Sequence, residues 1–464
     1  ILKIAIECRA RDTDKFRHIV ARVATEEAIE PLLSTCAPPI ITFSQISTFF
    51  RHLVITTPGL WATIDDSAFV IPSILQLHLD RSRNFLLDIY CTSGFVNNKY
   101  VDAIIQLLPH AHRWRSLDFY FRREGSRKSV CHALASAAVP KVKSMAICHA
   151  SIEAMENTPI VFRGGSPSLT HLHMFGVLPC IPYDSSVITH MYLDHLLCDT
   201  LPTTSHARLI AVLADMTSLE YISLRGHSIN MSPPLALTPL RLTKLKTLKI
   251  DLHDPEEEVV DLDVEGPPPN YLVTILTTFM PVHLTCLYIL FPPHGILYSV
   301  ILALRNNEIA FPHVEELYWA ADEDLDCADA LALTRAFPAL KVFVLVDTYD
   351  PFIIHTLGSE VWPKLHTVQL ASDLLFEARQ LVGARIRAGV PLKYVRLEGE
   401  EVKPENNSRP GAIVEIESLL EASGGKEENG ANKTPSVHAA DVVAWMRKHV
   451  EVEFVPFVQS LQDI

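Results

Sequence analysis

Three histidines in a short stretch of the chain have the residue type and spacing of a metal site. His171 and His173 are two residues apart, so on a β-strand they lie on the same face. With His190 on the neighbouring strand, the three imidazoles would match the ligand set of a catalytic zinc ion with an open fourth position. Only Asp194 is a candidate base beside them, and the chain has 21 histidines in all. We therefore expect no metal and no cofactor, and we interpret these histidines as part of a polar binding face.

Other sequence patterns of catalysis are absent. The chain has no HExxH, no GxSxG and no GxxxxGK[ST] segment. Its nine cysteines are scattered and form no CxxC pair, which is typical of reduced thiols in a cytoplasmic or nuclear protein. We expect no catalytic residue and no enzyme activity.

The composition argues against nucleic-acid and membrane partners. Lys and Arg number 40 and Asp and Glu 54, and the net charge of −14 repels phosphate backbones. Residues 271–304 lack charged side chains, but Pro281, Pro292 and Pro293 interrupt them. A membrane-spanning helix needs about 20 continuous apolar residues. We expect neither partner, and a location in the cytoplasm or nucleus.

A repeat predicts the elements that position the histidines. The pattern apolar-x-x-apolar-x-apolar recurs eleven times, with most units close to the length of a leucine-rich repeat, roughly 20–29 residues. The units begin at Trp114, Val142, Leu169, Ile188, Leu219, Leu245, Leu284, Val314, Leu340, Leu365 and Leu392. Helix-like segments, such as residues 101–108, 296–304 and 374–386, fill the gaps. Each unit would bury its apolar face only by stacking on its neighbours.

The predicted fold is α/β: an irregular leucine-rich-repeat solenoid with a parallel sheet on its concave face and helices outside. The Asn or Cys that usually follows the third apolar position is replaced, for example by Val177 and His227, so we expect no asparagine ladder. The predicted division is a helical segment at 1–64, a connecting helix and strand at 65–100, the solenoid at 101–398, a flexible acidic loop at 399–436 and a capping helix at 437–464.

Residues that flank the second and third apolar positions of each unit point to the predicted concave face. Tyr and Arg are common anchors of protein-binding sites, and they are frequent at these positions. The predicted substrate-binding residues are His171, His173, His190, Tyr192, Tyr221, Arg225, Tyr288, Tyr318, Tyr394 and Arg396.

Residues 41–64, ITFSQISTFFRHLVITTPGLWATI, resemble the second half of the F-box in fungal F-box/leucine-rich-repeat proteins. Ile46, Arg51, Leu53 and the Thr-Pro-x-Leu-Trp segment ending at Trp61 match that family's pattern. Phe50 replaces its Trp, the Leu-Pro start is missing and residues 10–39 form a long insert. Because the chain begins without Met, we expect it to be a fragment whose motif started earlier.

The resemblance implies that the N-terminal segment binds a Skp1-type adaptor of a cullin ubiquitin ligase. The implied contact residues are Ile4, Ile46, Phe49, Phe50 and Leu53, four of which have helical spacing. The same stripe can instead be local core, and Trp61 is expected to be core. The first hypothesis is thus a ubiquitin-ligase adaptor that presents an unknown protein substrate on its repeat face. The alternative is a leucine-rich-repeat interaction protein with a degenerate F-box and no ligase role.

Overall fold

The computed structural model describes most of the chain and divides it into two compact units. The first unit comprises residues 1–268 and 278–282, and the second comprises 269–277 and 283–464. The described residues are 39–91, 98–121, 124–149, 160–175, 181–182, 184–194, 206–226, 240, 242–252, 270–279, 283–291, 296–320, 327–345, 362–371, 374–398 and 439–455.

A small helical segment opens the described part of the first unit. It consists of α3 (Pro39–Ile46), α4 (Thr48–Thr56), the 3-10 helix η1 (Pro58–Trp61), β1 (Thr63–Ile64), α5 (Asp66–Val70) and α6 (Pro72–Ser82). Ser47 has an extended backbone, and its hydroxyl accepts a hydrogen bond from the Phe50 N–H at 3.2 Å. This N-cap separates α3 from α4. The predicted apolar stripe therefore spans two helices, because Ile46 ends the first and Leu53 lies on the second.

Trp61 holds this segment together. Its side chain is 2% exposed, as the sequence predicts for a core residue, and its Nε1–H donates to the Val54 carbonyl at 2.7 Å. The Arg81 guanidinium lies 4.9 Å from the ring centroid, and the His78 ring packs edge-on at 5.2 Å. These contacts join α4 and η1 to α6.

The sheet of the first unit is parallel throughout. Its strand order is β1-β2-β3-β4-β6-β8-β9-β10. After β1 the strands are β2 (Leu87–Cys91), β3 (Trp114–Phe121), β4 (Ser144–His149), β6 (His171–Phe175), β8 (His190–Asp194), β9 (Tyr221–Arg225) and β10 (Thr247–Asp251). A separate pair joins β5 (Ile160–Val161) to β7 (Ile181–Pro182).

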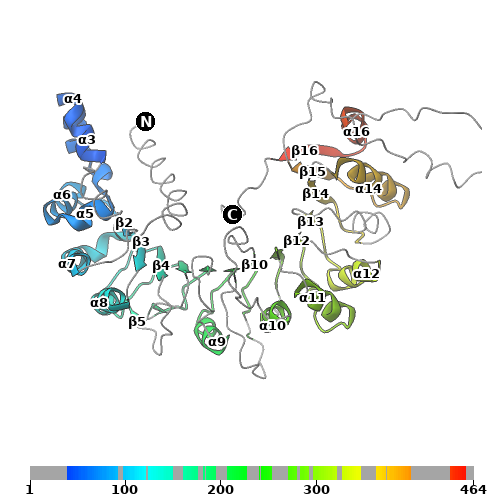
Figure 1. The fold of residues 1–464 in the computed structure, drawn as a ribbon, viewed down its shortest axis with the longest axis horizontal. Helices are drawn as coiled ribbons and strands as arrows, with labels where there is room; N and C mark the ends of the chain where they lie inside the picture. Colours follow the sequence, from blue (N-terminus) through cyan, green and yellow to red (C-terminus); the bar gives the residue numbers. More distant parts are fainter. Residues whose placement is uncertain are drawn as a thin grey trace, which may run out of the picture. The chain divides into compact units, whose positions relative to one another are not determined.

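Helices cover one face of this sheet. They are α7 (Asn98–Leu107), the 3-10 helix η2 (Leu108–Arg113), α8 (Glu124–Leu134) and α9 (His206–Ala214), and Figure 1 shows α7, α8 and α9 on one side of the strands. Leu172 and Met174 are buried on this side, whereas His171 and His173 alternate with them and are exposed or half-buried. Successive side chains of a strand point to opposite faces, so the apolar residues enter the core and the imidazole rings lie on the other face of the sheet.

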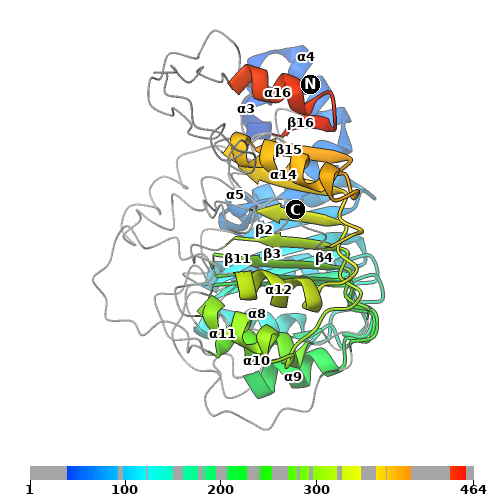
Figure 2. The same cartoon turned by 90° about the vertical axis from the view of Figure 1, so that its right-hand side faces the viewer.

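The second unit repeats this arrangement. Its parallel strands, in sheet order, are β11 (Cys286–Leu290), β12 (Glu316–Trp319), β13 (Val342–Leu345), β14 (Thr367–Ala371), β15 (Tyr394–Glu398) and β16 (Glu451–Val455). Its helices are α10 (Tyr271–Thr278), whose last residue belongs to the first unit, α11 (Ile296–Arg305), α12 (Cys327–Ala336), α14 (Leu375–Arg387) and α16 (Ala439–Met446). In both views α11, α12 and α14 lie on one side of the strands (Figures 1 and 2).

The predicted α/β arrangement of parallel strands and helices is confirmed. The second and third apolar positions of all eleven units lie in strands β3 to β15 and are buried. Strand β16 was not predicted, since residues 437–464 were expected to form only a capping helix. The positions at which an asparagine ladder would stand, and the predicted acidic loop at 399–436, lie outside the described residues.

The uncharged stretch at 271–304 is divided between two helices and a strand. It contains α10, β11 and α11, each of them short. Within the described part of the chain, no helix has both the length and the apolar character needed to cross a membrane.

Candidate functional site

Three rings stack across neighbouring strands of the first unit. His171 on β6 pairs in register with His190 on β8, which pairs with Tyr221 on β9. The rings of His171 and His190 are nearly parallel, with centroids 4.4 Å apart and planes inclined by 10°. The His190 and Tyr221 rings follow at 5.6 Å and 23°. The in-register pairing of the parallel strands therefore brings rings from distant sequence positions into one continuous stack.

A second row of rings lies two residues further along the strands. His173 pairs with Tyr192, and their ring centroids are 5.2 Å apart. Tyr192 also contacts Tyr221, with 5.1 Å between centroids. We name the five rings of these two rows the ring ladder, and the side of the sheet that carries them the ladder face.

Two threonines orient the stacked imidazoles. The Thr170 hydroxyl lies 2.9 Å from Nδ1 of His171, and the Thr189 hydroxyl lies 2.9 Å from Nδ1 of His190. Each hydroxyl also lies within hydrogen-bond distance of a backbone carbonyl, that of Lys143 for Thr170 and that of Thr170 for Thr189. A hydroxyl that donates to its carbonyl accepts from the Nδ1–H of the imidazole.

Packing makes His171 harder to protonate. Burial, and secondarily the neighbouring His190, lower the pKa of His171. Burial also raises the pKa of Tyr192. At neutral pH, His171 is therefore uncharged and Tyr192 keeps its proton.

Charged side chains border the ring ladder at the carboxyl ends of the strands. Arg225 lies 3.6 Å from a carboxylate oxygen of Asp194 and 3.6 Å from one of Asp251. Lys249, two residues before Asp251, has a pKa lowered by burial, an effect that Asp251 opposes. Arg225 was predicted as a binding anchor, and the structure places it half-buried between two carboxylates on the ladder face.

The ladder geometry does not suit zinc. Two nitrogen ligands at about 2.0–2.1 Å must direct their lone pairs at one point. Parallel rings separated by 4.4 Å hold the lone pairs of His171 and His190 side by side instead. His173 packs against Tyr192, and the described residues contain no group of three or more His, Cys, Asp or Glu that could hold a metal ion.

The corresponding face of the second unit is more deeply packed. Tyr288 and Tyr318 stack at 4.0 Å and 17°, but Tyr288 is only 6% exposed and belongs to a buried cluster with Cys286 and Val344. Burial raises the pKa of Cys286 to about 12, so this thiol stays protonated. Tyr288 thus lies at its predicted position on the strand, but its ring packs into the buried cluster and is not exposed for binding.

The other two predicted residues of the second unit lie on β15. Tyr394 is 39% exposed, and Nε of Arg396 donates to Glu453 of β16 at 3.1 Å. Glu453 was not among the predicted residues, because β16 was not predicted. The predicted substrate-binding residues therefore form two groups, one in each unit, and the ring ladder belongs to the first.

An exposed apolar stripe lies on α3 and α4. Ile46 is 59% exposed, Phe49 69% and Leu53 36%. Phe50 is half-buried and packs edge-on against Phe49 with ring centroids 5.7 Å apart. Ile55 of α4 is also 42% exposed, but it lies two residues after Leu53 and therefore on another side of the helix. The predicted residue Ile4 lies outside the described residues.

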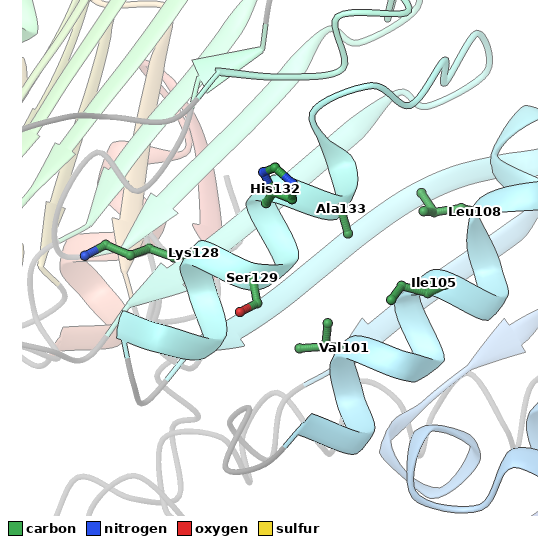
Figure 3. Close-up of a pocket in the computed structure, with 7 residues that line it drawn as sticks. All are labelled: Val101, Ile105, Leu108, Lys128, Ser129, His132 and Ala133. Carbon is green, nitrogen blue, oxygen red and sulfur yellow. The ribbon is translucent and has the colours of Figure 1, made fainter.

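A groove between α7 and α8 was also missed by the sequence analysis. Its volume is about 590 Å³, and Figure 3 shows Val101, Ile105 and Leu108 on one wall and residues of α8, including Lys128 and His132, on the other. Ile105 is exposed beside buried Ile104. An apolar residue on the outer side of a helix is the available sequence signal, but it is weak because single exposed apolar residues are common.

Comparison with known proteins does not place the chain in a family. No protein-family model matches the sequence, and no curated protein matches it significantly.

Proposed function

We propose that this protein is a non-enzymatic adaptor with two binding surfaces. The stripe on α3 and α4 binds a Skp1-type subunit of a cullin ubiquitin ligase, and the repeat strands present a protein substrate. On this proposal the strands and helices are leucine-rich repeats, and the N-terminal segment is an F-box. The observation that carries the proposal is the exposure of Ile46, Phe49 and Leu53, all of which were assigned to the Skp1 contact from the resemblance.

The stripe has the properties of a docking surface. Fully burying one large apolar side chain is worth roughly 1.5–3 kcal/mol, so leaving several exposed on two short helices forgoes substantial stabilisation. The N-cap at Ser47 and the hydrogen bond from Trp61 to Val54 hold α4 in a defined position. A rigid helix with exposed apolar residues suits recognition by a groove on a partner.

The ladder face supports the second half of the proposal. Tyr and His side chains are amphipathic and have few rotatable bonds, so little conformational entropy is lost when they bind. In the ring ladder they are already held by stacking and by two threonines. Such preorganisation favours a protein ligand without requiring any reaction.

Co-purification with a Skp1-type protein tests the ligase role. The full chain should retain Skp1, and the double substitution Phe49→Ala and Leu53→Ala should weaken binding by more than about tenfold. Phe85→Ala is the matched control, because Phe85 is also an exposed aromatic residue of the first unit but lies outside the stripe. Absence of Skp1 binding by the unsubstituted chain would refute the ligase role.

A second candidate function is a repeat interaction protein without a ligase partner. It is favoured by Phe50, which replaces the family's Trp and is half-buried rather than exposed. On this alternative the ladder face still binds protein, and substitutions in the stripe change no interaction. The same co-purification separates the two candidates.

A further inference from the structure

The stack of rings on the ladder face is open at its His171 end. His171 and His190 stack with nearly parallel planes, so His190 covers one face of the His171 ring. The opposite face is directed toward β4, because β6 lies between β4 and β8 in the sheet. The residue of β4 in register with His171 is Ser144, whose side chain is too short to cover an imidazole. His171 is accordingly exposed, whereas His190 is half-buried.

Small side chains continue beyond this open ring face. Ala146 lies on the same side of β4 as Ser144 and pairs in register with His173. Ser116 on β3 pairs with Ser144. All three small residues are half-buried, so they keep contact with solvent. A planar group that continues the stack would therefore lie over β4, about 4.8 Å from the neighbouring strand β6.

A carboxylate lies on the far side of that position. Asp118 on β3 pairs in register with Ala146 and is half-buried. A group over β4 is thus flanked by the imidazoles of β6 on one side and by Asp118 on the other. Asp118 also interacts with other groups of the protein, Tyr90 among them. A carboxylate has about four lone-pair sites, so it can accept hydrogen bonds from a ligand in addition.

The other end of the stack offers no such carboxylate in the next row. Tyr221 has its second face toward β10, because β9 lies between β8 and β10. Thr247 is in register with Tyr221, and the next residue on the same side of β10 is Lys249. A lysine ammonium donates hydrogen bonds and cannot accept them. The two ends therefore differ in the ligand that they suit, and only the His171 end suits a hydrogen-bond donor with a positive charge.

We propose that the ladder face binds an arginine side chain of its protein substrate, with the guanidinium stacked on the open face of His171 and hydrogen-bonded to Asp118. This inference rests on the proposed function and deepens it, since it names a residue of the substrate that the repeat face recognises. A guanidinium is planar, so it can stack on a ring while the N–H groups at its edge reach a carboxylate. A lysine ammonium lacks the plane, and a phenylalanine ring lacks the donors.

The imidazole does not oppose a cation. Burial and the neighbouring His190 lower the pKa of His171, so the ring is uncharged at neutral pH and does not repel a guanidinium. Lys143 directly precedes β4 and is exposed, so its long side chain can extend into solvent away from the ring.

Three peptides test this inference by NMR of the full chain, isotope-labelled at the histidine Cε1 atoms. Each has the sequence glycine-serine-X-serine-glycine with blocked ends, where X is arginine, lysine or citrulline, which keeps the plane but loses the charge. The His171 signal, assigned from its loss in His171→Gln, should shift with the arginine peptide. The dissociation constant of that peptide should be at least about fivefold lower than those of the other two. Equal affinities for the three peptides, or an unmoved His171 signal, would overturn the inference.

Two variants and a control locate the site. Ser144→Leu should fill the position over β4 and abolish the shift of the His171 signal. Asp118→Asn, which keeps the size of the side chain, should weaken arginine binding at least about fivefold. Thr247→Leu is the matched control, because it adds an apolar side chain at the Tyr221 end of the stack and should leave arginine binding unchanged.

Circular dichroism checks the fold of each variant. Undiminished arginine binding by Ser144→Leu, or by Asp118→Asn, would contradict the site. Skp1 co-purification uses the stripe on α3 and α4, so failure of the ligase role and failure of arginine recognition are distinguished.

Discussion

At the scale of the residue, His78 shows how one buried imidazole couples the N-terminal segment to pH. Its ring packs edge-on against Trp61, and its Nδ1 lies 3.2 Å from the Trp61 carbonyl. Burial lowers the pKa of His78, an effect partly opposed by Asp65. The folded protein therefore holds this imidazole neutral at a pH where the unfolded chain takes up a proton.

This difference predicts a loss of stability in mild acid. Below the unfolded-state pKa of about 6.5, the unfolded chain binds one more proton than the folded chain at His78, so the free energy of unfolding falls as the pH falls. His78→Asn, which preserves a donor to the Trp61 carbonyl, should flatten this dependence. Urea denaturation at about pH 7.5 and about pH 5.5 measures the effect.

Exposed His132 supplies the control for this prediction. His132→Asn should leave the pH dependence of unfolding as it is in the unsubstituted protein. An unchanged pH dependence in His78→Asn would mean that other groups account for the acid sensitivity.

The sequence predicts residue positions better than residue environments. The pattern around Leu172 and Met191 places His171 and His190 on one face, and the structure pairs them in register. The same pattern places Tyr288 on the corresponding face of the second unit, where it is nearly buried in a cluster with Cys286. Strand periodicity decides which way a side chain points, but the contacts it makes there depend on residues far away in the sequence.

At the scale of the element, Arg385 connects α14 to the segments that lead into two strands. Its guanidinium is fully buried and donates to the carbonyls of Trp362, Leu365 and Val390 at 3.1, 3.3 and 3.0 Å. Trp362 and Leu365 precede β14, and Val390 precedes β15. One side chain thus satisfies carbonyls in both turns.

Replacing Arg385 by Met should cost about 3–5 kcal/mol of unfolding free energy, because three buried carbonyls lose their donor. Chemical denaturation measures the loss. Arg387→Met tests whether any arginine of α14 has this effect, and it should change stability by less than about 0.5 kcal/mol because Arg387 is exposed. Similar losses in the two variants would contradict the role of Arg385 as a connector.

Element boundaries were predicted where local chemistry is strong. The helix expected at 374–386 corresponds to α14, Leu375–Arg387, because its apolar residues recur with helical spacing. The break at Ser47 carried a sequence signal that was overlooked: a serine before Thr-Phe-Phe is a good N-cap. Strand β16, with the sequence EVEFV, is too short and too acidic to be distinguished from a loop without its partner β15.

At the scale of the whole molecule, the C-terminal elements finish the sheet of the second unit. Strand β16 pairs with all five residues of β15, from Tyr394 to Glu398. Helix α16 buries Val442 and Met446, and its Trp445 ring lies 5.2 Å from the Arg379 guanidinium of α14. The predicted capping helix therefore exists, and a strand accompanies it.

Removing residues 439–464 should expose the backbone edge of β15 and the apolar surface of α14. We expect a lower melting temperature and association between copies, because unprotected strand edges pair with other chains. Thermal unfolding and size-exclusion chromatography measure these effects. Asp441→Ala, at an exposed position of α16, is the matched control and should behave like the unsubstituted protein.

Because the parallel strands pair one residue to one residue, each side-chain position of the ladder face can be substituted without moving the others. His171, His190 and Tyr221 are 19 and 31 residues apart along the chain, yet each occupies the same position on its own strand. Loop length can therefore drift over evolutionary time without moving a ring. A single substitution at one of these positions can change ligand specificity. Proteins with this repeated strand-and-helix architecture can therefore diversify their ligands while the fold stays the same.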